Sequence, residues 1–142
     1  MRYRSPPAGK RIPTATTLDG FFDVFADEVL SVARAAVGDD GEFLELRDAK
    51  DGRSYWLLNV TTTADALDEE HSEVERFTSG RIMDVTRHSF RADVIADVRV
   101  FRIPQLSGTV YFTSTAVDRL RAGGLEGLVF NEVWSNGSQL DA

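Results

Sequence analysis

The dipeptide Asp51-Gly52 constrains the fold of this chain more than any other feature of the sequence. It lies between two apolar stretches, Glu42–Arg47 and Ser54–Val60. Glycine supplies the positive φ that a tight reversal between antiparallel strands demands, so the sequence predicts a hairpin here. The second stretch, SYWLLNV, is apolar on both faces, which predicts a central strand covered on both sides.

A second hairpin is predicted further along the chain, from VERF, the Ser79-Gly80 turn and RIMDVTRHSF. After the connection RADVIAD, the run VRVFRI predicts a strand that Pro104 stops. The segment between the two hairpins, TTTADALDEEHSEVE, is polar, acidic and without a period up to Val74. We therefore expect it to be a loop.

A helix is predicted near the N-terminus, from about Asp19 to Gly38, because apolar residues recur there every three or four positions. Those residues are Phe22, Phe25, Val29, Val32 and Ala36.

Another helix is predicted over residues 115–122, after a short strand at Thr109–Phe112. Ser114 or Thr115 is expected to cap it, the latter in a loose capping box with Asp118. The paired glycines 123 and 124 follow this helix, where a left-handed residue ends a helix, and do not precede it as a phosphate-binding loop would. A last strand is expected in GLVFNEVW, which begins at residue 127.

This order of elements predicts an α+β protein with a mixed, mainly antiparallel sheet, an N-terminal helix and a C-terminal strand-helix-strand unit. The second helix is short for a crossover, so the sequence does not decide whether the two strands on either side of it are parallel neighbours. Residues 1–16 contain three of the four prolines and predict a flexible arm, and residues 17–142 predict a single domain.

The charge of the chain excludes some partners. The net charge is −7, and residues 1–13 contain four basic groups and no acidic one, which leaves 12 basic against 23 acidic groups in the remainder. Such a body repels nucleic acid and attracts a basic partner. The chain has no cysteine, no apolar run near the ~20 residues of a membrane span and no secretory signal pattern. These features favour a cytoplasmic protein without membrane contact.

Catalytic and metal motifs are weak. The chain has two histidines, and a metal site would need His71 together with Asp68 or Glu69, without the usual tight ligand spacing. Ser72 beside His71 does not form a triad, and the Gly-x-Ser-x-Gly elbow is absent from the sequence. We therefore expect that the protein is not an enzyme and that it binds neither a metal nor a cofactor. The alternative is a small enzyme or ligand-binding domain with a pocket between the sheet and its helices, around Tyr55, Asp84 and His88.

The strongest charge signal is the segment 65–75, which has six carboxylates and no Lys or Arg. Such a segment is typical of a solvated loop that helps solubility. The alternative is a patch that binds a cationic surface of a partner. Leu67 is expected to be buried and Ser72 to bond the backbone of this loop. Most aromatic residues lie on predicted strands and are expected in the core. Trp134, before the polar tail, is expected to be half exposed and to serve as an interface anchor.

Four stretches, YWLLNV, ALDEEHS, VFRIP and VYFTSTAVDRLRAGGLEGLVF, follow one another between about residues 54 and 134. In order and spacing they resemble a bacterial immunity-protein domain named after a myxobacterial example and formerly described as a domain of unknown function. The resemblance implies a role in polymorphic toxin systems, where an immunity protein binds the cognate toxin and protects the producing cell.

The resemblance and the charge together predict an immunity protein that binds a cognate toxin, with a basic surface, and neutralises it by occlusion. An uncharacterised interaction module is the remaining alternative, and the oligomeric state is left open. The expected contact residues are Asp65, Asp68, Glu69, Glu70, Glu73 and Trp134.

Overall fold

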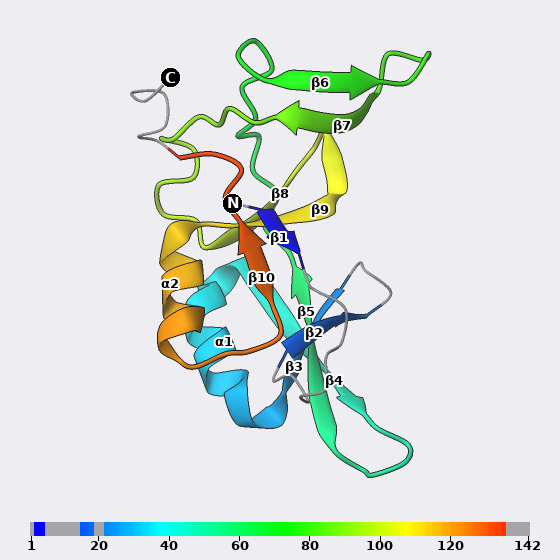
Figure 1. Cartoon of the computed structure of the whole chain (residues 1–142), viewed down its shortest axis with the longest axis vertical. Helices are drawn as coiled ribbons and strands as arrows, with labels where there is room; N and C mark the ends of the chain where they lie inside the picture. The colour runs from blue at the N-terminus through cyan, green and yellow to red at the C-terminus, as the bar shows by residue number, and fades with distance from the viewer. Residues whose placement is uncertain (1, 5–14, 19–21, 136–142) are drawn as a thin grey trace.

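The computed structural model describes residues 2–4, 15–18 and 22–135. Within these residues the paired strands form three antiparallel sheets, in the orders β10-β1-β9-β8, β2-β3-β5-β4 and β6-β7 (Figure 1). The strands are β1 (Arg2–Arg4), β2 (Ala15–Leu18), β3 (Phe22–Ala26), β4 (Gly41–Arg47), β5 (Ser54–Val60), β6 (Glu73–Arg76), β7 (Ile82–Arg87), β8 (Val100–Ile103), β9 (Leu106–Phe112) and β10 (Val129–Asn131). The α-helices are α1 (Leu30–Val37) and α2 (Ser114–Ala122), and short 3-10 turns at Asp27–Val29 and Gly38–Asp40 flank α1.

The α+β class and both predicted hairpins are confirmed. β4 and β5 pair over their whole length, and the turn glycine Gly52 has a φ of 72°. β5 is central, between β3 and β4. Burial on both faces was expected for β5, but its buried side chains lie on one face only. Leu58 and Val60 are buried, whereas Tyr55 and Leu57 on the other face are half-buried. β6 and β7 form the second hairpin, with Gly80 at a φ of 92°.

The prediction of one helix from Asp19 to Gly38 is wrong in its first half. Residues 19–21 lie outside the described residues, and Phe22–Ala26 form β3, which pairs with both β2 and β5. Helical hydrogen bonds begin only at Leu30, after the 3-10 turn. The sequence FDVFA is aromatic and β-branched, and two neighbouring strands satisfy its backbone groups, which outweighs the helical spacing of its apolar residues.

The C-terminal unit differs from its prediction in three details. β9 begins at Leu106, three residues before the predicted start, and the last strand covers only Val129–Asn131. β1 pairs antiparallel with both β9 and β10, so these two strands run parallel to each other without being neighbours. The intervening strand comes from the other end of the chain, which no local pattern predicts.

The N-cap position of helix α2 is occupied by Thr113, not by Ser114 or Thr115 as predicted. The hydroxyl of Thr113 donates to the carbonyl of Arg99 instead of bonding the helix amides, so the expected capping box is not formed. At the other end, Gly124 has a φ of 75°. This positive φ agrees with the interpretation of the glycines as residues that end the helix.

Within the part of the chain that the structure describes, the buried apolar side chains form two clusters. In the first, α1 and α2 pack together against β3, β5 and β9, around the fully buried side chains Phe25, Val37, Phe112, Val117 and Leu120. The second cluster lies toward the β6–β7 hairpin and includes Leu67, Val85, Phe90, Phe101 and Tyr111. Figure 1 shows both helices on one side of the molecule and the β6–β7 hairpin at the end opposite the β4–β5 hairpin.

The predicted arm over residues 1–16 is described only in part. Residues 2–4 are β1, and residues 15 and 16 begin β2. Residues 1 and 5–14 lie outside the described residues, so flexibility of the arm stays a prediction.

Candidate functional site

The acidic loop, residues 61–72, connects β5 to β6 and is tied to the body at its beginning. The amide of Arg102 donates to the carbonyl of Thr62 at 2.9 Å, and the amide of Ala64 donates to the carbonyl of Arg102 at 2.8 Å. Leu67 follows with an exposed fraction of 0% and forms a bridge with Phe90. The prediction that Leu67 is buried is therefore confirmed, and it holds the loop on the second cluster.

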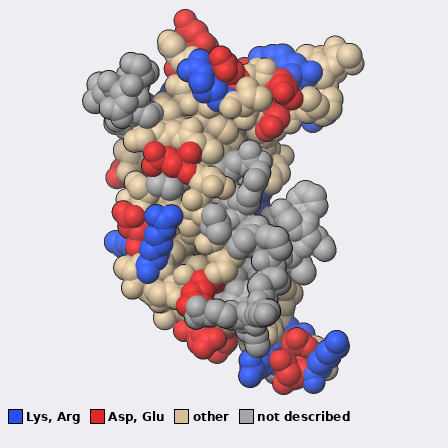
Figure 2. Space-filling view, viewed as in Figure 1, with Lys and Arg blue, Asp and Glu red and all other residues tan. Residues whose placement is uncertain are grey.

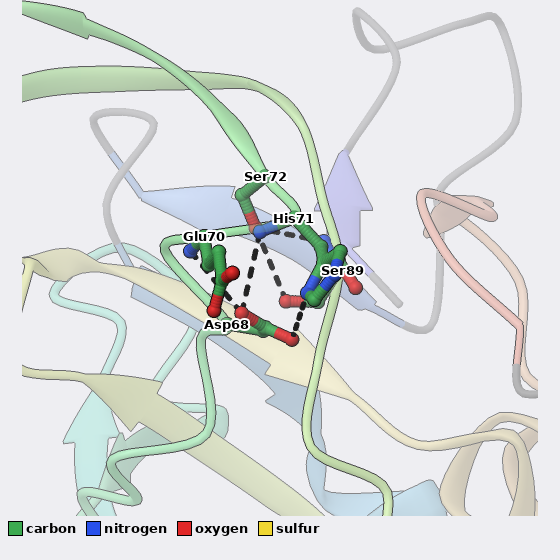
Figure 3. A network of polar contacts seen from close by, with 5 residues as sticks. All are labelled: Asp68, Glu70, His71, Ser72 and Ser89. Carbon is green, nitrogen blue, oxygen red and sulfur yellow. Dashed lines mark hydrogen bonds and ion pairs between the residues drawn. The ribbon is translucent and has the colours of Figure 1, made fainter.

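Ser72 fastens the other end of the loop. Its hydroxyl donates to the carbonyl of Ser89 at 3.2 Å and accepts from the amide of Ser89 at 3.0 Å. The amide of Asp68 donates to the same carbonyl at 2.8 Å. Figure 3 shows these contacts between the loop and the chain after β7. The predicted backbone bonding of Ser72 is confirmed.

Asp68 organises the turn between these two anchors. One carboxylate oxygen accepts from the amides of Glu70 and His71 at 3.1 and 3.3 Å, and the other accepts from Nδ1 of His71 at 2.8 Å (Figure 3). The hydrogen bond to Asp68 raises the pKa of His71 above its ordinary value of 6.5. The same bond lowers the pKa of Asp68 below 3.8. Asp68 thus closes the turn with three hydrogen bonds, one of which is an exposed ion pair with His71.

Arginines from the β6–β7 hairpin lie beside the carboxylates. Arg76 is 3.5 Å from Glu69, and Arg87 is 3.5 Å from Glu73. Figure 2 shows acidic and basic groups mixed at this end of the molecule. These counter-ions follow the acidic run in sequence or lie on the opposite strand, so the charge run alone did not predict them. Exposed pairs of this kind contribute about 0–1 kcal/mol, so the carboxylates stay available to a competing cation.

The remaining two acidic candidates differ in their surroundings. Asp65 is exposed and lies 3.4 Å from the side-chain amide of Gln105, which also donates to Glu69 at 3.1 Å. Glu70 is exposed and makes no ion pair with any other residue that the structure describes. Glu70 is thus the candidate with the most accessible negative charge.

Trp134 is half-buried, as expected, and lies close to the same end. Its ring packs edge-on against Phe90, with centroids 5.6 Å apart, and Phe90 in turn touches Leu67. Trp134 also lines a hollow of about 370 Å³ together with Ile95, Val98 and the start of α2. The structure therefore places Trp134 and the acidic loop around one aromatic residue, and its use as an interface anchor stays a prediction.

The alternative pocket around Tyr55, Asp84 and His88 is not formed. Tyr55 lies in β5 opposite Leu46, and Asp84 lies in β7 opposite Glu75. His88 is buried, and its Nε2 is 3.0 Å from the hydroxyl of Tyr111. Tyr55 thus lies in a different sheet from Asp84. His88 follows β7 and packs against Phe90 and Tyr111 of the second cluster.

Among residues 2–4, 15–18 and 22–135, no group of three His, Asp or Glu side chains could hold a metal ion. In the same described residues no helix is long and apolar enough to cross a membrane.

Sequence reasoning missed two exposed apolar side chains near the loop, Phe77 and Met83, which are 52% and 45% exposed. Phe77 directly follows β6 and Met83 lies in β7, and only for aromatic residues on predicted strands was burial generally expected. Their exposure follows from the pairing of β6 with β7 alone, because a two-stranded sheet has one face without a partner layer. The local sequence contains no signal for this.

A comparison with known families gives a match that spans most of the chain. The model of the Immunity protein family (Imm11) matches residues 43–135, which is more than half of the chain and includes the acidic loop, the β6–β7 hairpin and Trp134. No curated protein matches the chain. Strands β1 to β3 and helix α1 lie outside the matched range. On the strength of this match, the chain belongs to the immunity protein family Imm11.

Proposed function

We propose that this protein binds a cognate bacterial toxin in the cytoplasm of the producing cell and neutralises it by occlusion, without chemistry of its own. Membership of the immunity family supports the protective role. We also propose that the toxin is part of a polymorphic toxin system. The fold contributes a rigid body on which a binding surface is presented.

The observation that carries this proposal is the fixed shape of the acidic loop. Leu67 anchors one side of the turn, the Ser72–Ser89 bonds anchor the other, and the Asp68–His71 pair holds the turn between them. A solvated loop that served solubility alone would need none of these anchors. Ordering the carboxylates before binding reduces the conformational entropy lost in the complex.

The charge of this surface indicates the chemistry of the toxin. Exposed carboxylates at Asp65, Glu69, Glu70 and Glu73 attract a basic surface and speed the encounter with it. A toxin that cleaves nucleic acid has such a surface in its substrate groove. The carboxylates would then occupy the positions of phosphates, and the substrate would be excluded sterically and electrostatically.

The experiment pairs the protein with a candidate toxin, the product of the gene immediately upstream of its own. Expression of that toxin alone in a heterologous bacterium should stop growth, and co-expression of the immunity protein should restore it. The two purified proteins should also form a complex in size-exclusion chromatography. A toxin that kills equally well in the presence of the folded protein, and that forms no complex with it, would contradict the proposal.

A further inference from the structure

The β6–β7 hairpin is a separate two-stranded sheet that extends from the body beside the acidic loop (Figure 1). It is fixed in place by its inner side, since Val74 and Val85 lie opposite each other and pack into the second cluster. An ion pair between Arg76 and Glu69 connects the hairpin to the loop. The hairpin and the loop therefore form one continuous surface.

Two large apolar side chains stand out on this hairpin. Phe77 directly follows β6, where its amide donates to the carbonyl of Arg81 at 2.8 Å, and Met83 lies in β7. Both are about half exposed, whereas Val74 and Val85 of the same hairpin pack into the second cluster. Aromatic residues and methionine are enriched in protein interfaces, and a rigidly held aromatic loses little entropy on binding.

A charge feature of the same hairpin indicates what accompanies these side chains. Glu75 and Asp84 lie directly opposite each other across the strands. Side chains in such a pair are close neighbours, and like charges in this position repel each other. A cation placed between the two carboxylates would remove this repulsion. The partner surface that fits the hairpin therefore combines an apolar depression with an adjacent Lys or Arg.

We propose that the β6–β7 hairpin anchors the toxin: Phe77 and Met83 fill an apolar depression on it, and a basic side chain of the toxin lies between Glu75 and Asp84. This inference rests on the proposed function, because the occupant is the toxin. It assigns the main binding energy to the hairpin and leaves the acidic loop to steer the encounter. In the loop, the carboxylate of Glu69 is already paired with Arg76 of the hairpin, so we assign the loop to steering and not to anchoring.

The test measures the affinity of an inactive variant of the upstream toxin for four forms of the full chain by titration calorimetry. These are the wild type, Phe77→Ala, Glu75→Gln and Leu44→Ala. Leu44 is 47% exposed on the edge strand β4, in the hairpin at the opposite end, and is the matched control. Melting temperatures of all forms are recorded, to confirm that each form folds.

We expect Phe77→Ala to weaken binding about tenfold or more, as is usual for an interface hot spot, and Leu44→Ala to change it less than about twofold. Glu75→Gln should weaken binding while leaving the melting temperature equal or higher, because it removes the repulsion with Asp84. A wild type that binds tightly together with an unchanged Phe77→Ala variant would overturn the hairpin inference and leave the proposed function intact. A wild type that does not bind would overturn the proposed function itself.

Discussion

Ser72 and Ser89, seventeen residues apart, hold each other through two hydrogen bonds of 3.2 and 3.0 Å, in which the hydroxyl of Ser72 both donates and accepts. One serine ends the acidic loop, and the other follows strand β7. This contact makes the position of the loop depend on the hairpin, so the two parts of the proposed interface are ordered together.

Replacing Ser72 by alanine removes both bonds and leaves the amide of Ser89 without this partner. We expect a loss of about 1–3 kcal/mol in the free energy of unfolding, measured by urea denaturation. Amide hydrogen exchange at residues 68–72 should become faster. The control is Ser107→Ala, at an exposed position of β9. Equal stabilities for the two variants would show that the contact contributes nothing.

Replacing Leu67 by alanine leaves a cavity below the acidic loop, since this side chain is fully buried. The expected destabilisation is roughly 2–5 kcal/mol. Leu67→Asp should disturb the fold still more, because it buries a charge. Leu44→Ala, at an exposed position, should change the stability by less than about 0.5 kcal/mol. An unchanged melting temperature for Leu67→Asp would contradict the assignment of Leu67 as the buried anchor of the loop and of the carboxylates as its contact residues.

The His71–Asp68 pair predicts a dependence of stability on pH. Because the folded state raises the pKa of His71, its contribution is complete below the unfolded value of 6.5 and is lost as the pH rises through the folded pKa. The lowered pKa of Asp68 gives a contribution present above 3.8 and lost as the pH falls through the folded pKa. The difference in stability between the wild type and His71→Ala should therefore be largest between these two values.

Nuclear magnetic resonance titration of the imidazole checks the same pair directly. The pKa of His71 should lie above 6.5 in the wild type and return toward 6.5 in Asp68→Asn. Identical titration curves for His71 in the two proteins would show that the pair does not form in solution.

Reversing the charge at Glu69 and Glu70 tests electrostatic steering. The double variant Glu69→Lys, Glu70→Lys should bind the toxin with an association rate lower by roughly tenfold at low salt, and with a weaker dependence on ionic strength. The matched control reverses Glu28 and Asp39, which are exposed beside α1. An association rate that falls equally in both double variants would assign steering to the net charge instead of this loop.

Local signals in the sequence predicted the two hairpins, because Asp51-Gly52 and Ser79-Gly80 determine the turns without help from the rest of the chain. They did not predict the strand Phe22–Ala26, since its partners β2 and β5 lie elsewhere in the sequence. The insertion of β1 between β9 and β10 is likewise a contact between the two ends of the chain.

For the candidate site, the sequence identified the carboxylates and the burial of Leu67, both of which follow from residue type and local pattern. It did not identify the arginine partners of Glu69 and Glu73, because strand pairing places Arg87 opposite Glu73 and the folded path of the loop brings Glu69 to Arg76. It also did not identify the exposure of Phe77, because aromatic residues on predicted strands were expected mostly in the core.

The central claim is that this protein acts by covering a surface and not by chemistry, and an inhibition titration tests it most directly. The activity of the upstream toxin is measured at a fixed concentration far above the dissociation constant, while the immunity protein is added in steps. The account predicts a linear loss of activity that is complete at one equivalent, with full recovery of intact toxin on denaturing separation. Complete inactivation at a small fraction of one equivalent, or a covalently altered toxin, would contradict it.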